Sequence, residues 1–426
     1  MNGNSQQSTK CSDSVRASRF VDKNRLWNRH MEMAAIGAIP GNGVNRQALS
    51  REDIAARKLL ISWAAARRYE ISIDGIGNLF VRRPGSEPGL APVMTGSHMD
   101  SQPMGGRFDG IYGVLAGLEV MDALDEAGVQ TRRHIDLVAW TNEEGSRFAP
   151  GAMGSMVFTG SRPLDDFLGI KDQNGVSLSD ALADTIAAIP NCAFHEFATP
   201  VAAYVEAHIE QGPLLERAGS TIGVVTGIQG FRWFNVEVTG AAAHAGTTPI
   251  SLRRDALQAA VACISALNAL IREETDTLRF TIGRLDVTPN TPNTVPCSAA
   301  FSIDLRHPDQ VVLERVGDLV EATCRTACIR CAVKVTEIAT RSPCVFNPSM
   351  VDSVEEAAAR LGLPSMRMPS GAFHDALFMH EICPTGMVFV PCEKGISHNP
   401  AENAAPDDLA AGARVLLATL VELANA

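Results

Sequence analysis

The amino-acid sequence predicts an α/β fold into which a second, α+β domain is inserted. Residues 91–95 are an apolar run, residues 96–109 are polar, and residues 111–124 carry apolar side chains at helical spacing. A strand, a loop and a helix in this order are typical of a parallel sheet. The apolar run 135–140 and the polar loop 141–147 repeat the pattern. Such sheets bind ligands just beyond the carboxyl ends of their strands, so we expect the functional side chains there.

Segments at both ends of the chain extend this first domain. Residues 50–63 have the apolar spacing of a helix, and residues 71–81 alternate like two strands around a pair of glycines. Near the other end of the chain, the apolar run 387–391 is followed by the polar loop 392–402. This pattern predicts that the chain returns to the first sheet after the insertion.

The inserted segment alternates four expected strands with two expected helices. They are predicted, in chain order, at residues 233–239, 253–271, 279–285, 299–306, 311–328 and 333–338. The order strand, helix, strand, strand, helix, strand is that of a ferredoxin-like domain. We therefore predict that residues 22–229 and 342–426 form one domain and that residues 230–341 form the other.

Composition excludes several classes of partner. The 426 residues include 37 lysines and arginines against 48 acidic residues, a net charge of −11, which makes a nucleic-acid partner unexpected. No stretch reaches the roughly 18 uninterrupted apolar residues of a membrane span. The first twenty residues lack the apolar core of an export signal, and ten cysteines lie scattered along the chain, so we expect reduced thiols and a cytoplasmic location. Cys324, Cys328 and Cys331 are read as buried thiols rather than a zinc site, because no fourth ligand lies near them in the sequence.

The dense groupings of histidine and acidic residues lie at expected strand ends or turns. They contain His98 and Asp100, Asp109, Glu143 and Glu144, His208 and Glu210, and His398. Imidazole and carboxylate together are the ligands of zinc, manganese or cobalt. Because Asp100 lies two residues after His98, its carboxylate can accept the proton of the second ring nitrogen and fix the tautomer.

The acidic residues in these loops have two possible roles each. Asp109 can bind metal or cap the helix that follows it. Glu143 and Glu144 form either a solvated acidic turn or a functional pair, because neighbouring side chains in an extended segment point in opposite directions. If Glu144 binds a metal ion, Glu143 remains free to act as a general base. The four other loops, which also carry histidine or acidic residues, favour a functional Glu143–Glu144 pair over a solvated turn.

The charges of these residues are compatible with two divalent ions. Asp109 and Glu144 offset two of the four positive charges, and the excess would lower the pKa of a water and stabilise an oxyanion. Asp109 is the candidate bridge between the ions. Hydrolysis follows from this chemistry, and the motifs of serine hydrolases, P-loop proteins and dinucleotide-binding proteins do not occur in the sequence.

The chain resembles the hydantoinase/carbamoylase group of metal-dependent amidases from about residue 22 to its end. The segments that carry the resemblance are GSHMDSQPMGGRFDGIYGVLAGLE, WTNEEGSRFAPGAMGS, EAHIEQGPLLE, GIQGFRWFNVEVTGAAAHAGTTP, RRDAL, NTVP, DLRHP, HDA and GISHNPAE. The group includes N-carbamoyl-L-amino acid hydrolases, β-ureidopropionases and allantoate amidohydrolases. The resemblance implies a catalytic α/β domain interrupted by a smaller lid domain that also forms the contact of a homodimer.

The resemblance also implies roles for individual residues. One metal ion would be bound by His98, Asp109 and His208, and the other by Asp109, Glu144 and His398, with Glu143 as the catalytic base. The residues implied on the substrate side are His244, which would donate to the oxyanion, and Gln211, Asn293, Arg306 and His374.

Two of these substrate-side residues, and Phe373 directly before His374, leave alternatives open. Arg306 ends a strand with Asp304 on the same polar face, so it can grip a substrate carboxylate or pair with Asp304. His244 lies among small residues and can serve catalysis or be an ordinary hydrogen-bonded histidine. Phe373 stands where many members of the group have glycine, which changes the pocket or redirects the loop and leaves the preferred substrate open.

These observations together predict a two-metal amidohydrolase. We expect it to cleave the carbamoyl C–N bond of an N-carbamoyl amino acid or a related ureido acid, and so to release the amino acid, carbon dioxide and ammonia. The cofactors would be two divalent ions per subunit, zinc or else manganese, cobalt or nickel. The alternatives are an aminoacylase or dipeptidase reaction at the same metals, an allantoate amidohydrolase, and a binding protein without activity.

Overall fold

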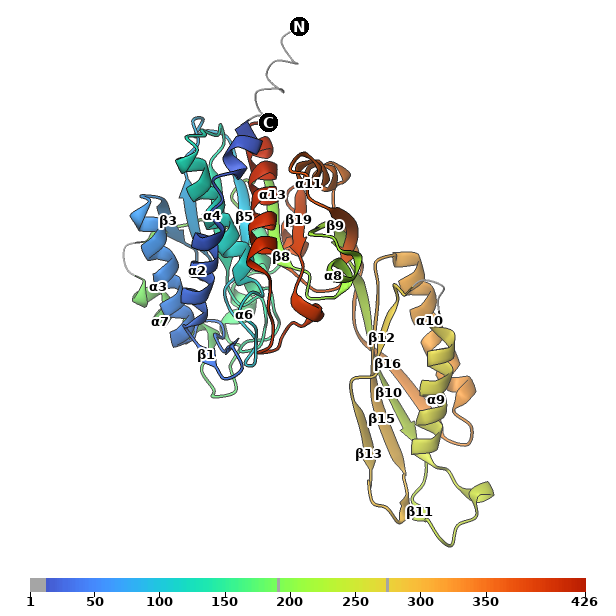
Figure 1. Cartoon of the computed structure of the whole chain (residues 1–426). Coiled ribbons are helices and arrows are strands. Elements are labelled where there is room, and N and C mark those ends of the chain that lie inside the picture. The colour runs from blue at the N-terminus through green and yellow to red at the C-terminus, as the bar shows by residue number, and fades with distance from the viewer. Residues whose placement is uncertain (1–12, 190–191, 273–275) are drawn as a thin grey trace. The chain divides into compact units, whose positions relative to one another are not determined.

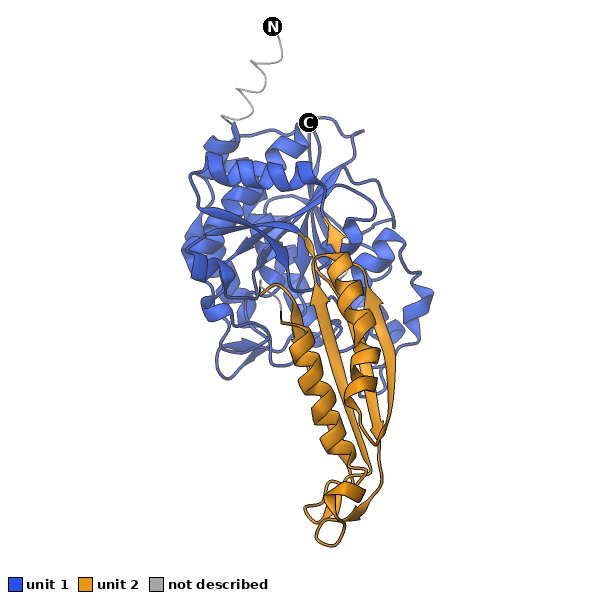
Figure 2. Ribbon diagram, turned by 90° about the vertical axis from the view of Figure 1, so that its right-hand side faces the viewer, with its two compact units in different colours: residues 1–226, 346–426 blue, residues 227–345 orange. Residues whose placement is uncertain are grey.

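The computed structural model describes residues 13–189, 192–272 and 276–426. These residues form two compact units (Figure 2). Unit 1 contains the chain up to Thr226 and the segment Phe346–Ala426, and unit 2 contains Gly227–Val345. No helix of the described residues is both long enough and apolar enough to cross a lipid bilayer.

Unit 1 is built on a ten-stranded mixed sheet with helices packed against it (Figure 1). Its strand order is β17-β9-β19-β8-β5-β6-β4-β3-β7, and β18 pairs with β9. Four neighbouring strands in the middle are parallel and buried along their whole length, namely β19 (Thr385–Val390), β8 (Ala203–Ile209), β5 (Val93–His98) and β6 (Ile135–Trp140). Apolar runs without alternation are expected when both faces of a parallel sheet are covered. The carboxyl ends of these four strands consequently lie at one edge of the sheet.

The remaining strands of this sheet lie on either side of the four parallel strands. On the β6 side are β4 (Leu79–Arg83), β3 (Glu70–Ile73) and β7 (Ala193–Phe194). On the β19 side are β9 (Ile222–Ile228), β17 (Cys344–Val345) and β18 (Ser365–Ser370). The expected strand pair at residues 71–81 is the antiparallel pair β3–β4, and the apolar run 387–391 forms β19 beside β8.

Helix α4 (Ile111–Glu126) packs closely on the parallel strands and is joined by α2 (Lys23–Ala34) and α13 (Pro406–Ala424). Two glycines allow the close approach. A Cβ atom at Gly113 would lie 2.3 Å from the carbonyl oxygen of Ala207 in β8, and one at Gly117 would lie 2.7 Å from the Leu137 side chain in β6. The first turn of α4 therefore lies against the strand ends, and the helix begins two residues after Asp109. Other helices of unit 1 include α3 (Arg51–Ala66), α5 (Met153–Thr159), α7 (Leu178–Ala188) and α11 (Pro348–Arg360).

Unit 2 has the strand and helix order of a ferredoxin-like domain. Its sheet order is β12-β15-β10-β16, and β13 also pairs with β15. The elements are β10 (Gly230–Thr239), α9 (Ala256–Leu270), β12 (Arg279–Thr281), β13 (Leu285–Thr288), β15 (Ser298–His307), α10 (Gln310–Ala327) and β16 (Ala332–Arg341). The inward side chains of β10 and β15 form a core with α9 and α10.

One expected strand of unit 2 is divided in two. Residues 279–285 were predicted to be one strand, but β12 and β13 are separate pairs with β15. Thr281 pairs with Asp304, and Leu285 pairs with Phe301. Between these two pairs, the segment from β12 to β13 therefore has one more residue than β15. This is the count of a β-bulge, and Gly283 lies within it.

Candidate metal centre

The parallel strands of unit 1 bring the predicted ligands together at one edge of the sheet. His98 is the last residue of β5, and His208 is the second-last residue of β8. Glu144 lies in the turn after β6, and His398 lies in the loop after β19. These residues are up to 300 positions apart in the sequence, since 398 minus 98 is 300. The topology of the sheet, rather than any local motif, therefore assembles the site.

Asp109 lies at the centre of this cluster and faces two groups of ligands. Its Oδ1 atom is 3.8 Å from His98 Nε2 and 3.2 Å from His208 Nε2. Its Oδ2 atom is 3.1 Å from His398 Nε2, which in turn is 3.4 Å from Glu144 Oε2. Within each group of three, the candidate ligand atoms lie no more than 4.8 Å apart. One carboxylate is thus shared by two groups, as a bridge between two metal ions requires.

The alternative role of Asp109 as a helix cap is not observed. The N-cap of α4 is Gly110, and no side chain makes a capping hydrogen bond there. Gly110 has a positive φ of 66°, and a Cβ atom at this position would lie 2.3 Å from the His98 ring. Glycine therefore allows the sharp turn that brings Asp109 and His98 together.

Backbone carbonyls fix the orientation of the two buried histidines. His98 Nδ1 is 2.9 Å from the carbonyl oxygen of Asp100, and His208 Nδ1 is 2.8 Å from that of Ile209. A proton on each Nδ1 leaves Nε2 as the atom available to bind a cation. The histidine side chains are only 2% and 1% exposed, so their positions are set by the sheet.

Asp100 has a different role from the one predicted for its carboxylate. Asp100 Oδ1 is 3.7 Å from His98 Nδ1, beyond hydrogen-bonding distance, because the backbone carbonyl of the same residue occupies that position. The carboxylate instead accepts hydrogen bonds from the backbone N–H groups of Glu143 and Glu144, both at 3.2 Å. Asp100 therefore orients His98 through its backbone carbonyl, and it orients the turn of Glu143 and Glu144 through its carboxylate.

Glu143 is buried and lies beside the first group of ligands. Its Oε2 atom is 3.4 Å from His98 Nε2, and Glu143 belongs to none of the three candidate metal groups found among the described residues. Burial raises the pKa of Glu143 well above its usual value, and the nearby carboxyl groups of Asp375 and Glu144 raise it further. A raised pKa makes the carboxylate a stronger proton acceptor. The solvated acidic turn is thus not what this structure contains.

The electrostatics of the cluster favour cations. Burial and the Asp109 charge raise the pKa of Glu144 to about 8. Burial also tends to raise the pKa of Asp109, but its side-chain contacts with the His208 and His398 rings outweigh burial and lower that pKa well below its usual value. The hydrogen bond to Asp109 raises the pKa of His398 to about 9. Buried carboxylates at such close range repel each other, and divalent ions between them would offset the repulsion. The residues present therefore fit a pair of metal ions.

Gln211 and the residues around His374 surround these ligands. Gln211 Nε2 donates to Asp109 Oδ2 at 3.0 Å, while its Oε1 atom is buried without a hydrogen-bond partner among the described residues. Its φ of +57° is unusual for a residue other than glycine, and such strain is common at functional sites. His374, expected in the polar lining, is 1% exposed because its ring packs edge-on against His208 at 4.5 Å. Phe373 packs against Phe378 at 5.8 Å in an apolar cluster, so that cluster anchors its ring.

The remaining predicted residues lie in unit 2. His244 and Asn293 meet where β11 (Ala243–His244) pairs with β14 (Thr294–Val295), and both are exposed. His244 Nδ1 accepts hydrogen bonds from the backbone N–H groups of Gly246 and Thr247, at 3.0 and 3.2 Å. The proton of a neutral His244 ring is therefore on Nε2. Arg306 donates to both oxygens of Asp304, at 2.8–3.1 Å. The pairing with Asp304, which the sequence left open beside binding of a substrate carboxylate, is therefore present.

Two residues with strong contacts in the cluster were not singled out from the sequence. Gln102 Nε2 donates to Glu144 Oε2 at 2.7 Å, and Gln102 N donates to Glu144 Oε1 at 3.1 Å. Glu402 Oε1 accepts from the backbone N–H groups of Phe108 and Asp109, at 2.8 and 3.1 Å. Both residues lie within sequence segments that carry the resemblance to the amidases. This position was the signal by which they could have been identified from the sequence. Their residue types alone did not separate them from ordinary surface positions.

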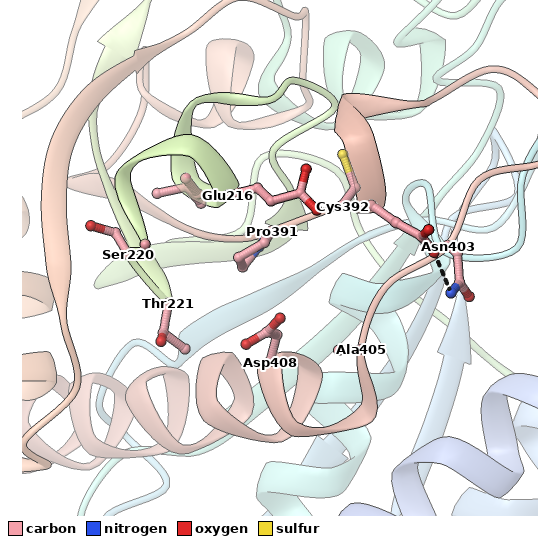
Figure 3. Close-up of a pocket in the computed structure, with 11 residues that line it drawn as sticks. Glu216, Ser220, Thr221, Pro391, Cys392, Asn403, Ala405 and Asp408 are labelled. Carbon is pink, nitrogen blue, oxygen red and sulfur yellow. Dashed lines mark hydrogen bonds between the residues drawn. The ribbon is translucent and has the colours of Figure 1, made fainter.

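Two other features are separate from this cluster. A cavity of about 450 Å³ follows β19 and is lined by residues such as Glu216, Cys392 and Asp408, but by none of the predicted site residues (Figure 3). No disulfide joins the nine cysteines within the described ranges. Of the three cysteines interpreted as buried thiols, Cys324 and Cys328 are buried and Cys331 is half-buried.

Comparisons with known proteins give a consistent result. A family model described as peptidase family M20/M25/M40 matches residues 94–422. The N-carbamoyl-L-amino-acid amidohydrolase of Rhizobium meliloti is 38% identical over 410 residues, which cover 96% of this chain and 98% of that protein. The ureidoglycolate hydrolase of Arabidopsis thaliana is 32% identical, over 96% of this chain and 88% of that protein. The crystal structure of a hydantoinase/carbamoylase family amidase from Burkholderia multivorans is 44% identical, with a TM-score of 0.89 and coverage of 95% and 98%.

These similarities confirm the mixed α/β fold and the resemblance to the hydantoinase/carbamoylase amidases that the sequence motifs indicate. The matched range begins in β5 and ends in α13, so it includes all five candidate metal ligands and the whole of unit 2. The chain belongs to the peptidase M20/M25/M40 family.

Proposed function

We propose that the protein is a two-metal amidohydrolase that cleaves the carbamoyl C–N bond of N-carbamoyl amino acids. With one water, the ureido group gives the free amine of the amino acid, carbon dioxide and ammonia. The observation that carries the proposal is the position of Asp109, whose two oxygens face two different groups of ligands. The N-carbamoyl-L-amino-acid amidohydrolase among the relatives supports the choice of substrate.

The residues for two ions are those of the two groups around Asp109. His98 and His208 would hold one ion and Glu144 and His398 the other, with Asp109 between them. Two such ions, zinc or else manganese, cobalt or nickel, would polarise the ureido carbonyl and lower the pKa of the attacking water.

Glu143 supplies the proton transfers in this proposal. Its carboxylate accepts a proton from the attacking water as the water oxygen adds to the ureido carbon. The same carboxyl group then donates that proton to the leaving nitrogen, so the base returns to its starting state. Burial keeps bulk water away from this group, and the raised pKa suits both transfers. Gln211 Oε1, which is buried and without a partner, would accept a hydrogen bond from a ureido N–H group.

Unit 2 would supply the remaining contacts as a lid and as the contact of a homodimer. His244 Nε2–H would donate to the oxyanion, with Asn293 beside it, and Arg306 would bind the substrate carboxylate. In the β10–β15 register, Ser298 pairs with Thr239 near the His244 end, whereas Arg306 pairs with Phe231 at the opposite end of the sheet. Eight steps along a strand span roughly 26 Å. One small substrate cannot touch both ends of one unit 2, so we propose that the two contacts come from two copies of the chain.

A second candidate substrate is a ureido acid other than an N-carbamoyl amino acid. The ureidoglycolate hydrolase of Arabidopsis thaliana matches nearly the whole chain and supports this possibility. Phe373, which stands where many hydantoinase/carbamoylase enzymes have glycine, is a place where the substrate pocket can differ. An aminoacylase or dipeptidase reaction remains the further alternative, since an amide and a ureido carbonyl make similar demands on a metal pair.

A substrate panel tests the proposed reaction. The purified protein, loaded with zinc, manganese or cobalt, is incubated with N-carbamoyl-α-amino acids, N-carbamoyl-β-alanine, allantoate, ureidoglycolate, N-acetyl amino acids and dipeptides. Ammonia and free amino acid are then quantified. We expect equimolar ammonia and amino acid from an N-carbamoyl amino acid. Turnover of acetylated amino acids or dipeptides alone, without ammonia, would contradict ureido cleavage.

Replacing Glu143 tests its role as the base. Glu143→Gln should lower kcat by about 10²–10⁴-fold, because the amide cannot accept the proton. Its metal content should stay unchanged, because Glu143 belongs to neither ligand group. Glu119→Gln is the matched control, since Glu119 is a buried carboxylate of unit 1 whose partners are Asp22 and Arg25. Activity near the wild-type level in metal-loaded Glu143→Gln would refute the assignment.

Mixing two variants tests whether the lid contacts come from two copies. Arg306→Ala should raise KM for carboxylate substrates, and His244→Ala should lower kcat. When the two variants are co-expressed with different tags and purified as a mixed pair, one site of each pair should regain both residues. The mixed pair should then be more active than either variant alone. A mixed pair with no gain in activity would show that both residues serve one site from the same copy.

A further inference from the structure

We propose that Glu402 is a positioning residue for the metal ion between Asp109, Glu144 and His398. The inference rests on the proposed two-metal function and adds a determinant of metal occupancy to it. Glu402 is 1% exposed and belongs to neither candidate ligand group. It would therefore act through the ligands and not on the metal itself.

The Glu402 carboxylate joins two segments that are far apart in the chain. On one side, Oε1 accepts hydrogen bonds from the backbone N–H groups of Phe108 and Asp109, at 2.8 and 3.1 Å. On the other side, Oε2 accepts from Ser397 Oγ at 3.0 Å. Asp109 is the candidate bridge, and Ser397 directly precedes His398. One buried side chain thus sets the distance between the bridging carboxylate and the loop that carries a ligand.

The loop of His398 depends on such internal contacts. Its base is closed by a hydrogen bond from Glu393 N to the carbonyl oxygen of Asn403, at 2.7 Å. A second hydrogen bond runs from Asn403 Nδ2 to Glu393 Oε2, at 3.1 Å, and is the dashed line beside Asn403 in Figure 3. At its tip, the His398 side chain is 51% exposed and its φ is +53°. The Glu402 carboxylate links this loop to the backbone of the opposite segment.

The other ligand group is held in a different way. His98 and His208 belong to central strands, and backbone carbonyls hold their Nδ1 atoms. Those contacts do not involve Glu402. Gly106 provides the room for Glu402, since a Cβ atom there would lie 2.0 Å from its carboxyl carbon. Loss of the carboxylate should therefore loosen the group of Glu144 and His398 and leave the ligands His98 and His208 in place.

Metal titration of Glu402 variants tests this inference. Outer residues of metal sites typically change affinity by about 10–100-fold, so Glu402→Ala should raise the dissociation constant of one of two ions by that factor. The other ion shares Asp109 but keeps both buried histidines, so its dissociation constant should rise by a smaller factor. Glu402→Gln should restore binding, because its amide oxygen still accepts both backbone hydrogen bonds and its NH₂ group can donate to Ser397 Oγ. Zinc or cobalt binding to the metal-free full chain is measured by calorimetry, and metal content by emission spectroscopy after dialysis.

Glu119→Ala is the matched control. It also removes a buried carboxylate that accepts a backbone hydrogen bond, from Asp22 N at 2.7 Å, so it should reduce stability without loss of metal. If Glu402→Ala does not fold, Ser397→Ala removes the loop-side contact of Glu402, together with the Ser397 Oγ contacts to Asp109 Oδ2 and Gln211 Nε2, and must weaken the same ion. Two ions bound with wild-type constants in the folded variant would overturn the inference. A wild-type chain that binds fewer than two ions would overturn the two-metal function itself, and this inference with it.

Discussion

The site depends on one buried carboxylate, that of Asp109, whose two oxygens face different candidate ligands. Asp109 Oδ1 faces two histidines that end parallel strands, and Oδ2 faces a histidine on a loop. A carboxylate in such a place is stable only among positive charges or hydrogen-bond donors. The close packing of α4 on the sheet, through Gly113 and Gly117, brings Asp109 to this position. The packing of α4 on the sheet of unit 1 is therefore required for the proposed metal-dependent chemistry.

The sequence was informative where one local rule decides the structure. Parallel strands covered on both faces must be apolar without alternation, so β5 and β6 could be recognised, and polar residues after them could be assigned to one edge. Histidines and acids in these loops then indicated the ligand set, and the shared motifs indicated the family. The alternating pattern of β15 likewise predicted that Asp304 and Arg306 share a face, which they do.

The sequence was less informative where several contacts compete for one group. The Asp100 carboxylate was expected on His98, but the carbonyl of the same residue lies closer, and the carboxylate binds the Glu143 and Glu144 N–H groups instead. The strand at 279–285 is interrupted because a bulge costs little beside a glycine. Glu402 and Gln102 could not be recognised by type, because their partners are backbone groups and side chains brought near only by the tertiary fold.

Anomalous diffraction from crystals grown with zinc or manganese measures the central feature most directly. We expect two peaks in each chain, about 3.5–4 Å apart, with Asp109 Oδ1 beside one ion and Oδ2 beside the other. His98 and His208 should bind the first ion, and Glu144 and His398 the second, while Glu143 stays unligated. A single peak, or two peaks without Asp109 between them, would show that Asp109 does not bridge two metal ions.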